Sequence, residues 1–351
     1  MPPFERDPEP LTSRRKTART ILLVLLGLTA AVVSQTAGAT TRVEDGGIEQ
    51  TTGGGGPFIP DPPPPPPSQP AAPKAKPKPK PAPKFGGKRL VFPVVGPVQY
   101  TNDFGAPRSG GTHQGNDLMA PKRSLAVAVE DGTIKFGHNS AHAGCYLYLY
   151  GKSKTYYLYI HLNNDLTKGN DNRGRCGPGV SYAKGLKDGQ KVKAGELIGY
   201  VGDSGDANGV APHLHFEVHP KGGNAVSPYP YLNRATRLLF AAKRGSLFTL
   251  ALGGAVVNTA TGEVRSRLKT VRSYPGGFKF VKVNRTITLS LPETAVVERK
   301  VGGVATSVST PMKALKKKAP VQIWTLRAPT TIEAQIGIDN ALVVDRALVL
   351  R

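Results

Sequence analysis

Short segments of β-branched and aromatic residues, separated by glycine-containing turns, fill the chain between residues 89 and 232. They include "SLAVAVEDGTIKFG", "CYLYLYG", "TYYLYIHL", "GELIGYVGDSG" and "HLHFEVHP". Apolar residues in these segments alternate with polar ones or run continuously, and none shows the period of an amphipathic helix. The region is long enough to bury a core of its own. We therefore predict an all-β domain over residues 89–232.

The chain after this region gives a weaker signal of the same kind. Three strand candidates are "VKVNRTITLSL", "VQIWTLR" and "NALVVDRALVL". In the first of them, apolar residues share one face of a strand: Val281, Val283, Ile287, Leu289 and Leu291. Residues 233–351 are therefore predicted to form a β-rich accessory region, to which the sequence assigns no function. The basic stretch "MKALKKKAP" within it is typical of a solvated loop.

Two segments precede the predicted domain. Basic residues between Arg14 and Arg19 are followed by an apolar run from Ile21 to Val33 and by small residues up to Ala39. This layout predicts that residues 1–39 are a signal peptide or a membrane anchor, with a cleaved signal favoured, and that the rest of the chain is exported. Residues 40–88 are rich in glycine, proline and lysine, which predicts a disordered, extended linker.

The formal net charge of +23 predicts affinity for polyanions. An exported chain meets anionic wall polymers and membrane surfaces, so that these are the expected partners of its basic segments, and nucleic acid is not. A second interpretation of the lysine-rich linker is that its charges only keep it solvated and extended. The sequence does not predict the oligomeric state.

The segment "HLHFEV" carries two of the seven histidines. In a strand, His213 and His215 project from the same face, while Leu214, Phe216 and Val218 face the core. Two adjacent imidazoles of this kind indicate a metal site or a catalytic pair, and two half-exposed histidines without a role are the alternative. Glu217 continues the polar face. We expect it to be a solvent-facing carboxylate rather than a partner of a metal ligand.

Two further segments carry histidines in a similar setting. In "GTHQGNDLMAP", His113 and Asp117 flank Gly115, which is expected to let the backbone turn so that the two side chains converge. Histidine and aspartate are ligands of catalytic zinc, which keeps one position open. In "YYLYIHL", His161 is predicted to share a strand face with Tyr159, and its two neighbours are predicted to pack in the core: Ile160 and Leu162.

Taken in this order, the motifs resemble those of the lysostaphin-type zinc metallopeptidases, which cut peptide bonds in bacterial peptidoglycan. "HQGND" matches the His-x-Gly-x-Asp motif of that family, "YIHL" matches Tyr-x-His-Leu, and "HLHFEV" matches His-x-His. The resemblance runs from about Phe92 to Leu232. It implies an antiparallel β-sheet of half-barrel type and a peptidoglycan substrate.

Carried over by position, the resemblance implies one zinc ion bound by His113, Asp117 and His215. His161 and His213 are then the catalytic histidines that do not bind the metal. The expected reaction is the hydrolysis of a peptide bond by a water molecule that zinc activates. The sequence does not divide the roles of base and oxyanion stabiliser between the two catalytic histidines, and it does not identify the bond that is cut.

The chain departs from the family in the stretch from residue 163 to 191, which is longer than the usual connection. Its glycines, asparagines and basic residues predict a loop that shapes or gates the substrate groove, or that is a neutral insertion. Cys145 and Cys176 are the only cysteines, and in an exported chain they are expected to form a disulfide. Free thiols and a zinc pair are the alternatives.

Three other functions compete with an exported zinc endopeptidase. The first is a catalytically silent or gated protein of the same fold that binds the wall or activates other hydrolases. The second is a carrier domain of the biotinyl or lipoyl kind, but Lys193 does not lie where the modified lysine is expected. The third is a wall-binding structural protein whose main activity is in residues 233–351. Because all five histidine and aspartate positions of the motifs are present, the enzyme is favoured.

Overall fold

The computed structural model describes residues 89–350 apart from 109, 138, 277–278, 309–310 and 339. The predicted signal or anchor and the predicted linker lie outside these residues. The described chain is built mainly of strands, and the prediction of an all-β protein with antiparallel sheets is confirmed. Among the described residues, no helix combines the length and the apolar character that a membrane crossing requires.

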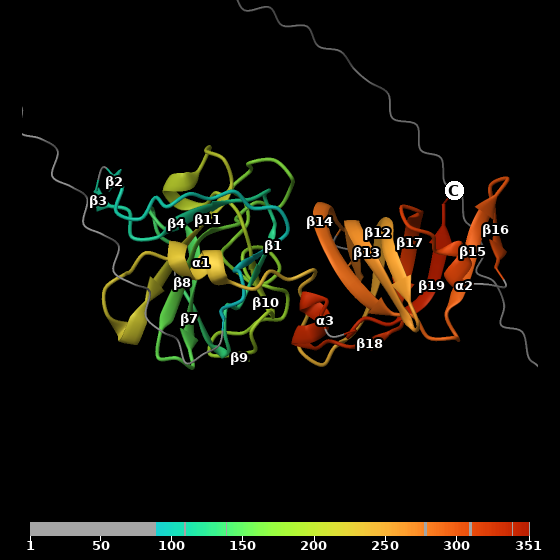
Figure 1. Ribbon diagram of the computed structural model, residues 1–351. Helices are drawn as coiled ribbons and strands as arrows, with labels where there is room; N and C mark the ends of the chain where they lie inside the picture. The colour runs from blue at the N-terminus through green and yellow to red at the C-terminus, as the bar shows by residue number, and fades with distance from the viewer. Residues whose placement is uncertain are drawn as a thin grey trace, which may run out of the picture. The chain divides into compact units, whose positions relative to one another are not determined.

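The larger sheet of the N-terminal part has six strands, which pair antiparallel throughout and lie side by side in Figure 1. In sheet order they are β4 (Asn116–Met119), β11 (His213–His219), β8 (Tyr156–Leu162), β7 (Cys145–Gly151), β6 (Gly132–Phe136) and β9 (Lys191–Val192).

Smaller elements complete this part of the chain. A three-stranded sheet has the order β1 (Val94–Val95), β5 (Leu125–Val127) and β10 (Leu197–Tyr200). A short hairpin precedes β4, and short helical turns follow β10 and β11. Their bounds are β2 (Pro107–Arg108), β3 (Gly111–Thr112), η1 (Gly205–Ala207), η2 (Pro220–Gly222) and α1 (Tyr229–Arg234).

Strict alternation along two strands of the six-stranded sheet separates core from surface. In β11, the predicted core residues Leu214, Phe216 and Val218 are fully buried. In β7, Leu147 and Leu149 are fully buried and pack in the same core. The residues between them project from the opposite face, because successive side chains of a strand point to opposite sides. One face of the sheet therefore fills the core, and the other carries the polar residues of β11.

The pairing of β7 with β8 is interrupted by a β-bulge. Cys145 pairs with Leu162 and Leu147 pairs with Tyr159, so that one residue of β7 stands opposite the two residues Ile160 and His161. His161 has a positive φ of 59°. The prediction that His161 shares a face with Tyr159 is therefore wrong, because the extra residue of the bulge turns His161 away from the core face.

The stretch between β8 and β9 is anchored to the domain at several points. A disulfide joins Cys176 to Cys145 at the start of β7. The carboxylate of Asp165 is fully buried and lies 2.6 Å from Nζ of Lys122. The hydroxyl of Tyr182 donates hydrogen bonds to backbone carbonyls of Gly137 and Tyr146, and its ring packs in the core. These contacts hold the inserted segment in one position against the sheet.

A second β-sheet forms the C-terminal part of the chain (Figure 1). Its order is β14 (Lys279–Ser290), β13 (Glu263–Tyr274), β12 (Leu247–Ala260), β17 (Pro320–Thr325), β19 (Val344–Val349), β15 (Val296–Val301) and β16 (Val304–Ser307). In addition, β18 (Ala328–Pro329) pairs with β12, and two short helices lie between strands: α2 (Pro311–Ala314) and α3 (Ile332–Ile336).

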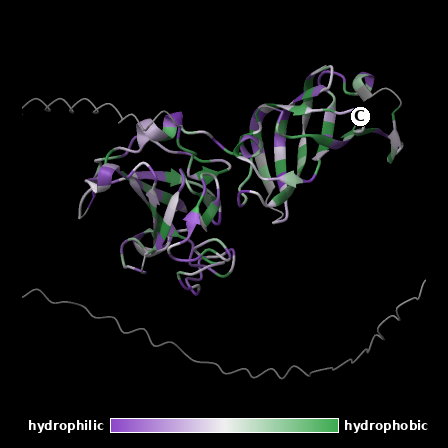
Figure 2. Cartoon of the chain, turned by 90° about the horizontal axis from the view of Figure 1, so that it is seen from below, coloured by the Kyte–Doolittle hydropathy of each residue, from purple (hydrophilic) through white to green (hydrophobic). Residues whose placement is uncertain are grey.

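Long antiparallel strands dominate this second sheet, and only β15 and β19 pair parallel among its described strands. Figure 2 shows the alternation of hydrophobic and hydrophilic residues along them. As predicted, Ile287, Leu289 and Leu291 lie on the buried side, in a core separate from that of the N-terminal part. The prediction of a β-rich C-terminal extension is confirmed.

Candidate metal centre and active site

Three side chains converge where β4 runs beside β11. Asp117 of β4 pairs directly with His215 of β11, and both project from the face opposite the core. His113 reaches the same point from the start of the loop that follows β3. Its Nε2 lies 3.0 Å from Oδ1 of Asp117 and 2.9 Å from Nδ1 of His215, and the latter two atoms are 3.0 Å apart. The structure thus brings together the three residues that the sequence predicts as ligands.

The outer nitrogens of the two histidines are held by oxygen acceptors. Nδ1 of His113 donates to the backbone carbonyl of Asp103 at 2.9 Å, and Nε2 of His215 donates to Oε1 of Glu217 at 3.1 Å. With the protons on these outer nitrogens, the inner nitrogens carry lone pairs. Histidines that bind metal ions are commonly oriented in this way by a carbonyl or a carboxylate.

The chemistry of the three inner atoms fits a metal ion. Two imidazole lone pairs and a carboxylate oxygen are all acceptors, and acceptors 2.9–3.0 Å apart repel one another unless a proton or a cation lies between them. Ligands of tetrahedral zinc with bonds of about 2.0–2.1 Å stand about 3.3 Å apart, close to the spacing seen here. Among the described residues, this is the one group of histidine, cysteine and acidic side chains with such spacing.

The electrostatics of the group favour positive charge. Burial would lower the pKa of His215, but the hydrogen bonds to Asp117 and Glu217 raise it to about 9. Burial likewise opposes ionisation of Asp117, but hydrogen bonds to His113 and His215 hold its pKa well below the usual range. The carboxylates that stabilise a proton on His215 stabilise a cation at the same place by the same attraction.

Glu217 was expected to face solvent, but it does not. Only 13 % of its side chain is exposed, and its two oxygens accept hydrogen bonds from His215 and from His219, the latter at 2.6 Å. Burial would raise the pKa of Glu217, but the bonds to the two histidines lower it to about 2. The expectation is wrong because Glu217 stands between His215 and His219 on one strand face, which alternation alone already allowed.

Gly115 is required for space rather than for a turn. The φ angle of Gly115 does not lie in the left-handed region, so the structure does not show the turning role that was expected of this glycine. A Cβ atom at Gly115 would lie 2.5 Å from the carbonyl oxygen of Phe216 and 2.7 Å from Nε2 of His215. The absent side chain therefore lets the His215 ring pack against the backbone beside His113 and Asp117.

Arg108 was not predicted from the sequence. From the β2–β3 hairpin, its Nη2 donates to Oδ2 of Asp117 at 2.8 Å. Because Oδ1 of Asp117 faces the two histidines, the two oxygens of this carboxylate have different partners. A single arginine in a glycine-rich turn carries no signal of such a contact, since the contact depends on how the hairpin folds over β4.

His161 and His213 lie beside the three predicted metal ligands, and the centroids of their two rings are 5.0 Å apart. Nδ1 of His161 donates to the backbone carbonyl of Ser204, and Nδ1 of His213 donates to that of Ala211, both at 2.9 Å. Nε2 is left as the acceptor in each ring. Nε2 of His213 is 3.9 Å from Oδ1 of Asp117. The structure thus brings the two predicted catalytic histidines next to the predicted ligands.

Asp206 of η1 also lies close to His161, a contact that was not predicted from the sequence. Oδ1 of Asp206 lies 3.7 Å from Nε2 of His161. Burial lowers the pKa of His161 to about 4, and the nearby His213 adds to the shift, whereas Asp206 opposes it. His161 is therefore neutral at neutral pH.

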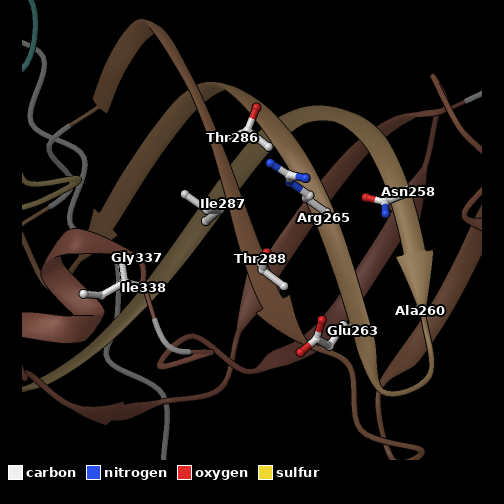
Figure 3. A pocket seen from close by; sticks show the side chains of 9 residues that line it. All are labelled: Asn258, Ala260, Glu263, Arg265, Thr286, Ile287, Thr288, Gly337 and Ile338. Carbon is white, nitrogen blue, oxygen red and sulfur yellow. The ribbon is translucent and has the colours of Figure 1, made fainter.

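A separate hollow lies on the C-terminal sheet and is shown in Figure 3. Its polar groups come mainly from β12, β13 and β14, with Glu263 and Arg265 as its charged residues. None of the histidines and aspartates described above lines it. The chemistry of acid–base and metal-binding groups is therefore concentrated on β4, β8 and β11. The lining residues are Asn258, Ala260, Glu263, Arg265, Thr286, Ile287, Thr288, Gly337 and Ile338.

Comparisons with known proteins match the same part of the chain. Residues 180–228, which include β11, match the model of peptidase family M23. The chain is 28% identical over 176 residues to the L-Ala--D-Glu endopeptidase of Bacillus subtilis, covering 45% of this chain and 47% of that protein. It is 29% identical over 129 residues to the peptidoglycan DD-endopeptidase ShyC of Vibrio cholerae, covering 37% and 22%.

Among solved structures, the catalytic domain of lysostaphin from Staphylococcus simulans is similar, with 26% identity, 39% of this chain and 92% of that chain covered, and a TM-score of 0.31. The chain spans less than half the length of these curated relatives. The matched residues carry the His-x-His strand that holds His213 and His215. This part of the chain is thus similar to peptidase family M23.

Proposed function

We propose that this protein is an exported zinc endopeptidase that hydrolyses peptide bonds of bacterial peptidoglycan. The convergence of His113, Asp117 and His215, with donor atoms 2.9–3.0 Å apart, carries the proposal. The peptidase family of the domain and the peptidoglycan endopeptidases among the relatives support the substrate. A catalytically silent relative would not be expected to keep all three metal ligands, the oxygen atoms that orient their rings, and the two further histidines.

His113, Asp117 and His215 would hold one zinc ion. When bound, zinc supplies a Lewis acid that polarises a carbonyl group and lowers the pKa of a water molecule to about 7. Glu217 and the carbonyl of Asp103 orient the two ligand rings, and Arg108 holds the outer oxygen of Asp117. The fixed rings keep the donor atoms converged before any ligand arrives, which is the requirement for a preorganised site.

His161 and His213 would move the proton. Each donates Nδ1–H to a backbone carbonyl, so that Nε2 is an acceptor with a fixed direction. As water adds to the carbonyl carbon of the peptide bond, Nε2 of one of these two histidines accepts one proton of the water. The same proton passes to the amide nitrogen, which leaves when the C–N bond breaks. An imidazole that carries the proton also stabilises the negative charge on the carbonyl oxygen.

Export is part of the proposal. Peptidoglycan lies outside the cytoplasm, and the disulfide between Cys145 and Cys176 is of a kind that persists in oxidising compartments. The basic residues of the chain would then meet anionic wall polymers or the membrane surface.

The test measures bound zinc and the release of new amino groups from purified peptidoglycan sacculi, with the full chain. Wild type is expected to bind about one zinc and to release amino groups. His215→Ala should lose both, and His161→Ala should keep the zinc and lose the release. His142→Ala is the matched control, because this histidine is 92 % exposed, and it should behave as wild type. Wild type that binds zinc but releases no amino groups would favour the silent or gated protein instead.

A further inference from the structure

An aromatic surface occupies part of the outer face of the six-stranded sheet. It consists of Tyr146, Tyr148 and Tyr150 of β7, Tyr156 of β8 and His219 of β11, and we refer to it as the tyrosine surface. The ring centroids of successive members are 5.7, 5.9, 5.9 and 4.3 Å apart. The rings are thus in contact from β7 across β8 to β11.

The strand alternation forces these rings outward. Leu147, Leu149 and Tyr157 are fully buried in the core, so that their neighbours in β7 and β8 must project from the other face. The side chains of the surface are partly exposed, and Tyr150 is 48 % exposed. Partly exposed tyrosines in contact with one another are typical of binding surfaces, because each ring offers a large apolar face and a hydroxyl.

The tyrosine surface is continuous with the metal centre. The ring of Tyr156 stacks on that of His219, with planes only 10° apart. His219 donates to Glu217, which in turn accepts a hydrogen bond from the ligand His215. All these residues project from the same face of the sheet. A polymer bound at His215 therefore extends over the tyrosine surface if it runs across β8 and β7.

We propose that the tyrosine surface binds the sugar chain of peptidoglycan while the attached peptide lies at the metal centre. The proposal rests on the proposed function. The C–H faces of pyranose rings carry partial positive charge and stack on the negative faces of aromatic rings, and tyrosine hydroxyls exchange hydrogen bonds with sugar hydroxyls. Both kinds of contact use the exposed rings and hydroxyls that β7 and β8 present on this face.

The distances agree with this arrangement. Neighbouring strands lie about 4.8 Å apart, so that β8 and β7 are about 5 and 10 Å from β11 across the sheet. An extended peptide spans at most about 3.5 Å per residue. Along the strands, Tyr148 and Tyr150 are offset from His215 by about 7 and 13 Å, because they lie level with Glu217 and His219. Four or five residues of peptide therefore connect a bond cleaved beside His215 to a sugar on the ring of Tyr148 or Tyr150.

The cation that stands opposite Tyr148 is not available to an anionic wall polymer. Lys135 of β6 stands opposite Tyr148 in the β6–β7 pairing, and its Nζ is 2.7 Å from Oδ2 of Asp188. This cation is thus already matched by a carboxylate. An anionic polymer needs cations that remain available for it. The sugar backbone of peptidoglycan, with its hydroxyl and amide groups, makes no such demand.

The test uses the full chain and two probes: glycan strands whose peptides have been removed and whose freed carboxyl groups have been converted to amides, and a soluble stem peptide without sugar. Tyr150→Ala combined with Tyr148→Leu removes two rings and keeps apolar volume at the half-buried position. We expect glycan binding in a sedimentation assay to weaken about tenfold. The KM for sacculi should rise with kcat unchanged, and cleavage of the stem peptide should stay at the wild-type rate.

Tyr274→Ala is the matched control, because Tyr274 is 41 % exposed and lies on the C-terminal sheet. It should bind glycan strands as wild type does. The proposal is overturned if the double variant sediments with glycan strands as wild type does, or if Tyr274→Ala weakens binding equally. It is also overturned if the double variant changes only the molecular mass in solution, since the surface would then join two copies of the chain. If wild type cleaves neither sacculi nor stem peptide, the proposed function fails, while the sedimentation assay still decides the sugar site.

Discussion

Oδ1 of Asp117 and Nδ1 of His215 lie 3.0 Å apart because the two residues pair directly across the antiparallel strands β4 and β11. The contact therefore depends on the register of the two strands. A shift of one residue in either strand would turn one of the two side chains to the core face. Leu118 and Leu214, which pair with each other and are fully buried, oppose such a shift.

The charge of Asp117 is expected to be needed for metal binding. Asp117→Asn keeps the shape of the side chain but removes the negative charge between His113 and His215. We expect zinc affinity to fall at least about tenfold, measured by competition with a chelator, and peptide hydrolysis to fall with it. Asp345→Asn is the control, since Asp345 is exposed on β19 of the C-terminal sheet. Wild-type affinity in Asp117→Asn would contradict the assignment of this ligand.

Glu217 is expected to act on the metal through His215. Glu217→Gln keeps an oxygen for the Nε2–H of His215 but loses the charge that stabilises a cation on the other side of the ring. Such outer partners are worth about 10–100-fold in metal affinity. We expect a loss in this range with no change in the fold, measured by zinc titration and circular dichroism. Glu333→Gln, at an exposed position of α3, should change neither, and unchanged affinity in Glu217→Gln would return Glu217 to a solvent role.

Gly115 is expected to tolerate no side chain. In Gly115→Ala, the new Cβ would meet the backbone of Phe216 at 2.5 Å, which a rotamer change cannot relieve. We expect the free energy of unfolding to fall by about 1–3 kcal/mol, measured by urea denaturation, together with weaker zinc binding because the His215 ring is displaced. Gly110→Ala is the control, since no atom lies within 4 Å of the Cβ position there. Equal stability of both variants would show that the backbone at Gly115 can move aside.

His161 is expected to make the stability of the metal-free protein depend on pH. Its pKa is lowered to about 4 in the folded state, chiefly by burial, whereas the unfolded chain has the ordinary value of about 6.5. Between these values the unfolded state binds more protons. The free energy of unfolding therefore falls as the pH decreases from about 6.5 to 4, by up to about 3 kcal/mol from this residue.

His161→Gln should remove this part of the dependence. Urea denaturation of the chelator-treated wild type and variant at pH 7 and pH 4.5 measures the difference between the two proteins, so that other titrating groups cancel. The slope with pH should be smaller in the variant. A slope identical to that of wild type would show that His161 titrates normally in the folded state.

The sequence predicted those parts of the site that regular strands build. β11 keeps strict alternation, so the orientation of His213 and His215 followed from spacing alone. His161 did not follow from it, because the bulge at Ile160 and His161 depends on the pairing with β7. The solvent exposure of Glu217 was predicted wrongly, and the contact of Arg108 with Asp117 was not predicted. Neither contact follows from the pattern of a single segment, because the partners meet only in the folded chain. The C-terminal strands followed from alternation, whereas the parallel pairing of β15 with β19 had no local signal.

The bulge in β8 also makes the orientation of His161 independent of the packing of the core. In a strand of strict alternation, a residue at position 161 would belong to the same row as Tyr157 and Tyr159, and any change of it would alter the volume of the core. With one residue added, Tyr157, Tyr159 and Leu162 all remain in the core while His161 stands among the histidines. Substitutions at His161 can therefore vary the reactivity of the site while the hydrophobic interior stays as it is.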